Sequence, residues 1–171
     1  MLCHPSLLLG QSVATLQRSS IRFLSVRPFK SDKLHIAVIL GSTRTDGPPF
    51  PAPLGTRVGK WVESLLHFRG HDVTIIDPVS ENLPLLTRPH FAYPKTQAPK
   101  NLDRLADTFR TADGFVAITP EYNHAPSPAL LNIFNHFGSS LFSYKPSAIV
   151  TYSAGQWGGC YSEPASITVV H

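Results

Sequence analysis

Three polar loops, each directly behind an apolar run, hold the residues most able to bind a charged or planar ligand. The first, Gly41-Ser-Thr-Arg44, offers two hydroxyls, backbone N–H groups and a guanidinium ahead of a predicted helix. These donors suit a phosphate monoester. The loop has neither the Gly-Lys-Ser/Thr of a P-loop nor the GxGxxG of a dinucleotide fingerprint. Taken alone it is also explained as a Ser/Thr-rich helix start, and the proline-rich insert at 45–54 argues against direct contact between phosphate and helix N-terminus.

The second loop, Pro120-Glu-Tyr-Asn-His124, follows the apolar run that ends at Thr119. Its backbone offers hydrogen-bond groups to a planar heterocycle, Tyr122 is able to pack against a ring, and Asn123 tolerates a left-handed turn. Glu121 and His124 raise the question of acid–base catalysis. We interpret Glu121 as an acceptor that holds the loop and His124 as a solvated histidine, so the sequence predicts no catalytic side chain.

The third loop is Ser153-Ala-Gly-Gln-Trp-Gly-Gly159. Its glycines allow backbone to approach a ligand closely, and Gln156 or Trp157 would border the ligand's other edge. A glycine-rich turn around a core tryptophan is the alternative interpretation. Together the three loops supply phosphate donors, ring contacts and a glycine-lined edge, which describes a site for flavin mononucleotide (FMN).

Strands and helices alternate along the chain in the order that would bring these loops together. The pattern predicts strands at 34–40, 72–77, 114–119 and 147–153, with helices at 55–69, from Asn101 and from Ser127. Such alternation is typical of an α/β doubly wound parallel sheet. Ligands of these sheets bind beyond the carboxyl ends of the strands. We therefore expect the three loops to meet at one edge of the sheet.

Three local signals locate the helices more closely. Residues 55–69 carry an apolar face at three-to-four spacing that includes Trp61 and Leu65. Asn101 is predicted to cap the next helix. Ser127 as cap, with Pro128 at the first helical position, is predicted to begin the third.

The basic charge of the chain lies in its first 33 residues. These hold five basic residues and one acidic residue, and the totals of 15 basic and 11 acidic residues leave ten of each for the rest. A nucleic-acid-binding face on the folded part is therefore not expected. No apolar run is long enough to span a membrane. Cys3 and Cys160 do not have the spacing of metal ligands, so no metal site is expected.

Residues 1–33 are predicted to be a targeting leader. They are rich in Arg and Ser, with a rough apolar stripe at helical spacing, which is the composition of a mitochondrial presequence. A secretory signal is the weaker alternative, and a disordered leader without an address is a third, which would leave the protein cytoplasmic. The remainder, 34–171, is expected to form one FMN-binding domain.

On these motifs the sequence resembles the NAD(P)H-dependent FMN reductase family, flavodoxin-like proteins that include quinone, azo-dye and chromate reductases. The similarity covers roughly residues 34–159, and its most specific element is Pro120-Glu-Tyr-Asn123. The other matching segments are Gly41-Ser-Thr-Arg44, Arg57-Val-Gly-Lys-Trp-Val62, Pro128 with Leu130, and Tyr152-Ser-Ala-Gly-Gln-Trp-Gly-Gly159.

The resemblance implies a role for each loop. Ser42, Thr43 and Arg44 would hold the FMN phosphate; Pro120, Glu121, Tyr122 and Asn123 would run along the isoalloxazine; and Ser153, Gly155, Gly158 and Gly159 would line its other side. It also implies ping-pong turnover, in which NAD(P)H reduces FMN and a quinone or similar small acceptor takes the electrons. A homodimer or tetramer is implied, with an interface role for the proline-rich connector before Asn101.

The chain departs from the family pattern in two respects. Leu131 and Asn135 stand where family members usually have Lys and Asp. The family also continues beyond the double glycine with a helix, a strand and a final helix, and we expect this chain to lack that unit. The fourth strand would then be an uncovered apolar edge. The alternative function is a non-catalytic flavodoxin-like fragment that binds flavin weakly or pairs with full-length subunits.

Overall fold

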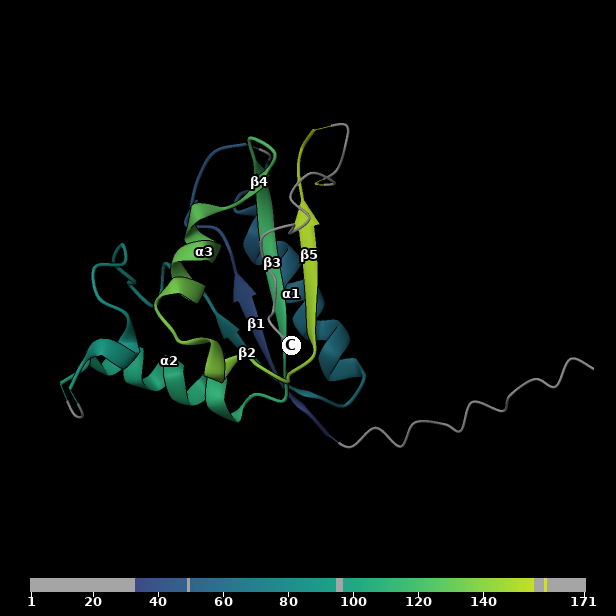
Figure 1. The fold of residues 1–171 in the computed structure, drawn as a ribbon. Helices are drawn as coiled ribbons and strands as arrows, with labels where there is room; N and C mark the ends of the chain where they lie inside the picture. The colour runs from purple at the N-terminus through teal and green to yellow at the C-terminus, as the bar shows by residue number, and fades with distance from the viewer. Residues whose placement is uncertain (1–32, 49, 95–96, 156–158, 160–171) are drawn as a thin grey trace, which may run out of the picture. The chain divides into compact units, whose positions relative to one another are not determined.

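Four parallel strands form the main sheet of this computed structural model, which describes residues 33–48, 50–94, 97–155 and 159 (Figure 1). β1 (His35–Leu40) lies between β2 (Asp72–Ile76) and β3 (Gly114–Tyr122), and β5 (Ser147–Tyr152) pairs with the other edge of β3. The predicted α/β parallel sheet is confirmed. The predicted leader at 1–33 lies outside the described residues except for Lys33.

Helices cover both faces of this sheet. α1 (Leu54–Phe68) lies on one face, while α2 (Lys100–Thr111) and α3 (Pro128–Asn135) lie on the other (Figure 1). Alternate residues of β1 enter two separate cores: Val38 packs with Val62 of α1, whereas Ile39 packs with Phe109 of α2. A strand buried on both faces reads as a continuous apolar run, which is why β1 and β3 were recognisable in the sequence.

The second loop is more regular than the sequence indicated. β3 does not end at Thr119 but continues to Tyr122, where it turns back to pair antiparallel with β4 (Ala125–Pro126). The two turn residues, Asn123 and His124, have φ angles of 52° and 61°. Two consecutive left-handed residues form the tight hairpin turn that matches strand twist, so the left-handed turn predicted at Asn123 is confirmed.

The first helix presents a narrower apolar face to the sheet than predicted. Val62 is buried, but Trp61 is 63% and Leu65 41% exposed, so the expectation that both face the core is wrong. The helix lies close to β1 at Gly59, where an added Cβ would come 2.7 Å from Leu40 Cδ2. The buried residues of this helix are Gly55, Gly59 and Val62, so the contacting stripe is lined mainly by glycine, and Trp61 and Leu65 lie outside it.

The second helix begins one residue earlier than its predicted cap. Pro99 precedes it in extended conformation and makes no side-chain cap, and Asn101 lies inside the first turn. The Asn101 side-chain N–H donates to the Glu81 carbonyl at 3.1 Å. The capping prediction is therefore wrong: the Asn101 side-chain oxygen, which a cap would use as acceptor, accepts from the adjacent Leu102 N–H at 3.0 Å inside the first turn.

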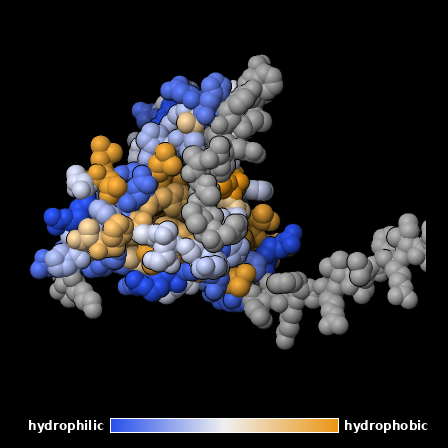
Figure 2. All heavy atoms as spheres, viewed as in Figure 1, coloured by the Kyte–Doolittle hydropathy of each residue, from blue (hydrophilic) through white to orange (hydrophobic). Residues whose placement is uncertain are grey.

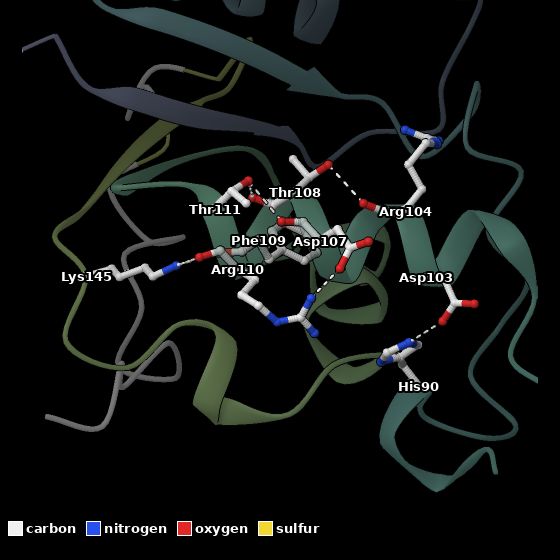
Figure 3. A network of polar contacts seen from close by, with 9 residues as sticks. All are labelled: His90, Asp103, Arg104, Asp107, Thr108, Phe109, Arg110, Thr111 and Lys145. Carbon is white, nitrogen blue, oxygen red and sulfur yellow. Dashed lines mark hydrogen bonds and ion pairs between the residues drawn. The ribbon is translucent and has the colours of Figure 1, made fainter. Parts of the chain in front are cut away.

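Lysine caps the other end of this helix. Lys145 Nζ donates to the carbonyls of Phe109 at 2.7 Å and Arg110 at 2.8 Å (Figure 3). Desolvation lowers the pKa of Lys145. A cation at a helix C-terminus satisfies carbonyls that have no partner within the helix. The loop before β5 is thus tied to the end of α2.

The third helix begins as predicted. Ser127 Oγ accepts a hydrogen bond from Leu130 N–H at 3.2 Å, and Pro128 occupies the first turn. Two short 3₁₀ helices also occur: His90–Ala92 precedes α2, and Ser139–Leu141 follows α3. Among the described residues, no helix is long and apolar enough to cross a membrane.

The fourth parallel strand lies at the edge of the described sheet. Within the described ranges β5 pairs with β3 alone. Its first two residues, Ser147 and Ala148, are exposed and the remaining four are half-buried, whereas most of β3 is buried.

Candidate functional site

A pocket of about 340 Å³ opens at the carboxyl ends of β1, β3 and β5. This volume lies in the range of about 300–1,000 Å³ that holds small-molecule ligands. All three predicted loops contribute to its wall, as does the start of α1. Of the predicted site residues, those that line it are Ser42, Arg44, Pro120, Glu121, Tyr122, Ser153 and Gly155.

The other four predicted residues stand apart from this lining. Thr43 is exposed, and Asn123 forms the hairpin turn at the end of β3. Gly159 is buried with φ of 92°, and an added Cβ there would meet the Tyr152 N atom at 3.0 Å. Gly158 lies outside the described residues. Any ligand role for these four stays a prediction.

Arginine and serine shape the first loop. Arg44 N–H donates to Ser42 Oγ at 3.2 Å, and Arg44 Nη2 donates to the Pro48 carbonyl at 2.8 Å. The guanidinium therefore ties the proline-rich insert back to the loop. This bond uses one of its five N–H donors. Asp46 also lines the pocket, and its carboxylate accepts a hydrogen bond from Gly47 N–H.

The N-terminus of α1 borders the same pocket. Pro53, Leu54 and Gly55 are among its lining residues, and the helix has neither a side-chain cap nor an acidic residue in its first turn. Its first N–H groups and its dipole are thus available to an anion. This differs from the expectation that the insert would keep the helix N-terminus from the ligand. The long insert folds back on itself, which its length in the sequence does not reveal.

A second tyrosine, missed in the sequence, completes the pocket wall. Tyr152, the last residue of β5, lines the pocket together with Tyr122. Burial raises the pKa of Tyr152, against the opposing effect of a hydrogen bond with the Ser42 side chain. The phenol is therefore protonated at neutral pH. The final residue of an apolar strand gave no signal of a ligand role.

The Glu121 and His124 side chains face each other across the hairpin turn. Glu121 Oε1 lies 3.5 Å from His124 Nδ1, with the carboxylate side chain 10% and the imidazole 71% exposed. The pair links β3 to the turn residue that follows it. This geometry suits the predicted role of Glu121 in holding the loop.

A buried chain of hydroxyls joins the first two loops. Ser127 N–H donates to Thr119 Oγ1 at 3.0 Å, and the Ser127 hydroxyl donates to the Gly41 carbonyl. Thr119 Oγ1 in turn donates to the Pro120 carbonyl at 2.9 Å. Thr119 and Ser127 are fully buried. The Ser127 cap was predicted, but its bond to Gly41, 86 residues away, has no signal in the sequence.

No group of histidine, cysteine and acidic side chains suited to a metal ion occurs in the part of the chain that the structure describes. The pocket lining combines groups suited to an anion, namely Arg44, Ser42 and the α1 N-terminus, with Pro120 and the two tyrosine rings. This chemistry suits a phosphorylated molecule that carries a planar ring.

Comparison with known proteins gives a family match. The family model described as NADPH-dependent FMN reductase matches residues 34–169. An NADPH azoreductase of Bacillus sp. is 34% identical over 88 residues, which cover 50% of this chain and 46% of that protein. A quinone reductase of Pseudomonas putida is 35% identical over 65 residues, covering 36% of this chain and 35% of that protein. These matches span about half or less of the relatives' own length.

Solved structures agree on the fold. The flavoenzyme NAD(P)H:(acceptor) oxidoreductase of Paracoccus denitrificans superposes with a TM-score of 0.55 at 25% identity, covering 75% of this chain and 66% of that one. An oxidoreductase of Corynebacterium diphtheriae superposes with a TM-score of 0.51 at 20% identity, covering 72% and 65%.

Proposed function

The chain belongs to the NADPH-dependent FMN reductase family, and on that premise we propose that it holds FMN in the pocket and passes electrons from NAD(P)H to a small acceptor. The observation that carries this proposal is the convergence of the three loops on one pocket beside the uncapped N-terminus of α1. The family supplies the cofactor pair, and the pocket supplies a place for the flavin.

The residues present fit FMN. Arg44 and the first N–H groups of α1 would bind the phosphate, and Ser42 would add a hydroxyl. Pro120 and Tyr122 would pack against the isoalloxazine, with Ser153 and Gly155 at its other edge. Bound FMN would supply the hydride-accepting ring, so the protein's task is to bind and orient it.

Arg44→Gln tests this placement. The variant removes the cation beside the phosphate and should weaken FMN binding about 10-fold or more, because a charge-assisted hydrogen bond contributes about 1.5–3 kcal/mol. The change is measured by titrating flavin-free protein into FMN and monitoring the quenching of flavin fluorescence. Arg69→Gln is the matched control, since Arg69 is exposed at the opposite end of α1. It should bind FMN as the wild type does.

Two further measurements separate an active reductase from a flavin-binding fragment. FMN should raise the melting temperature of the wild-type chain, because a ligand that binds only the folded state stabilises it. NADPH should be oxidised in the presence of FMN and a quinone. A chain that gains no FMN contradicts the proposal, and one that binds FMN without oxidising NADPH supports the non-catalytic alternative.

The acceptor is proposed to be a small planar molecule such as a quinone. Two relatives that match in sequence are named for the reduction of an azo compound and a quinone, and both kinds of acceptor are flat and largely apolar. The apolar part of the pocket lining, with Pro120 and Tyr122, has the matching character.

We also propose that the connector between β2 and α2 is a self-association surface. Among its described residues it carries four exposed apolar side chains: Val79 at 44%, Leu85 at 79%, Leu86 at 38% and Phe91 at 69%. Apolar (orange) side chains are exposed at the left of Figure 2, where Figure 1 draws the connector. Large exposed apolar patches mark interaction sites.

Two side chains of α3 hold this connector in shape. Asn132 donates to the Pro84 carbonyl at 2.9 Å and accepts from Leu86 N–H at 2.9 Å. His136 Nε2 lies 3.0 Å from the same carbonyl. The surface is thus fixed before any partner arrives, which lowers the entropic cost of association.

Leu85→Asp should therefore shift the chain toward the monomer. A charge placed on the connector's most exposed leucine would have to be desolvated in an interface. Analytical ultracentrifugation over a concentration series measures the shift. Phe68→Asp is the control, because Phe68 is 86% exposed on α1 and lies outside the connector. Equal effects of the two substitutions, or a wild-type monomer at all concentrations, would contradict the proposal.

A further inference from the structure

We propose that Tyr152 is a positioning residue of the flavin site: its hydroxyl holds Ser42 and the first turn of α1 in the arrangement that receives the phosphate. This inference rests on the proposed FMN function and assigns a task to a residue outside the predicted set. It also explains why position 55 is a glycine, because a larger side chain would collide with the Tyr152 hydroxyl.

The geometry at Gly55 carries the inference. A Cβ added to this buried residue would come within 2.5 Å of the Tyr152 hydroxyl oxygen and 3.5 Å of Ser42 Cβ. The phenol oxygen therefore occupies the space that a side chain at position 55 would take. Ser42, Gly55 and Tyr152 all line the pocket. β5, the first loop and α1 thus meet at one hydroxyl.

The chemistry of the phenol suits this task. Tyr152 is half-buried and stays protonated at neutral pH, so its O–H is a hydrogen-bond donor. The Ser42 hydroxyl, which accepts a hydrogen bond from Arg44 N–H at 3.2 Å, lines the same pocket. A neutral phenol adds no negative charge that would compete with the phosphate for Arg44. Tyr152 would therefore act on the phosphate through Ser42 and the helix start.

Tyr152→Phe separates a phosphate-directed role from a general packing role. FMN and riboflavin share the ring and differ in the phosphate. The variant should weaken FMN binding about 10-fold, the effect of losing one well-placed hydrogen bond, and riboflavin binding by less than about 2-fold. In a Ser42→Ala background the same substitution should cost less than about 2-fold for FMN, because residues acting as one unit are not additive.

Two tyrosines serve as controls. Tyr122→Phe alters the ring end and should change FMN and riboflavin binding by the same factor. Tyr144→Phe, at a residue 92% exposed, should bind both ligands as the wild type does. Equal losses for both ligands in Tyr152→Phe, or no loss at all, would overturn the inference. A wild-type chain that binds neither ligand would instead refute the proposed function.

A complementation experiment tests the contact without flavin. Gly55→Ala should lower the melting temperature, because its methyl group meets the phenol oxygen. Adding Tyr152→Phe removes that oxygen and should restore most of the loss. If Gly55→Ala melts as the wild type does, or if the double variant melts no higher than Gly55→Ala, Tyr152 does not fill this space and the inference fails.

Discussion

Gly41→Ala is expected to lower the free energy of unfolding by about 2–3 kcal/mol, the cost of overpacking a rigid core position. A Cβ at this buried residue would lie 2.7 Å from the Ile118 carbonyl oxygen, 3.0 Å from Leu130 Cβ and 3.1 Å from Ser127 Oγ. None of these atoms is the free end of a flexible side chain. The backbone at the end of β1 would have to shift.

The shift should reach the pocket. Gly41 N–H donates to the Ile118 carbonyl at 2.7 Å, and the Gly41 carbonyl accepts the Ser127 hydroxyl, so both bonds lengthen if the backbone moves. Ser42, the next residue, lines the pocket. We therefore expect weaker FMN binding together with lower stability, measured by fluorescence titration and urea unfolding.

Gly138→Ala is the matched control for this substitution. The nearest atom to a Cβ at Gly138 is Phe91 Cδ1 at 3.4 Å, an ordinary van der Waals contact. Its stability should remain within about 0.5 kcal/mol of the wild type. If Gly41→Ala is as stable as Gly138→Ala and binds FMN normally, the close packing of β1, β3 and α3 at the pocket is disproved.

Phe109→Ala should have the largest effect on stability, a loss of about 3–5 kcal/mol. The side chain is fully buried, and its ring centroid lies 6.0 Å from that of Phe115, 4.9 Å from that of Phe137 and 5.1 Å from that of Phe142. Its removal leaves a cavity at the centre of the core beneath α2. Because a whole domain is stable by only about 5–15 kcal/mol, this loss removes a substantial share of the variant's stability.

Urea denaturation with a far-ultraviolet circular dichroism signal measures this loss. Phe68→Ala removes the same ring from a residue that is 86% exposed and should change stability by less than about 0.5 kcal/mol. Phe109→Leu keeps most of the volume and should fall between the two. Similar stabilities for Phe109→Ala and Phe68→Ala would show that the aromatic cluster is not the core of the α2 face.

Local sequence patterns account for much of this fold. The apolar runs of β1 and β3 and the Ser127-Pro128 helix start were recognisable because each depends on residues within one turn or one strand. The placement of the three loops at one edge also followed from the sequence, since parallel connections bring the ends of successive strands together. Asn101 shows the limit of such signals: it lies inside the first turn of α2, where its side-chain oxygen accepts from Leu102 N–H and its side-chain N–H donates to the Glu81 carbonyl.

The sequence by itself determined the order of the strands and helices, the family and the three segments that carry the candidate site. Only the tertiary structure decided which side of α1 faces the sheet, that Ser127 binds the Gly41 carbonyl, and that the Tyr152 hydroxyl fills the space beside Gly55. The physical reason is distance along the chain. Periodicity and capping act over a few residues, whereas the Ser127–Gly41 and Gly55–Tyr152 contacts join residues about 90 positions apart, and all three features exist only once the sheet has formed.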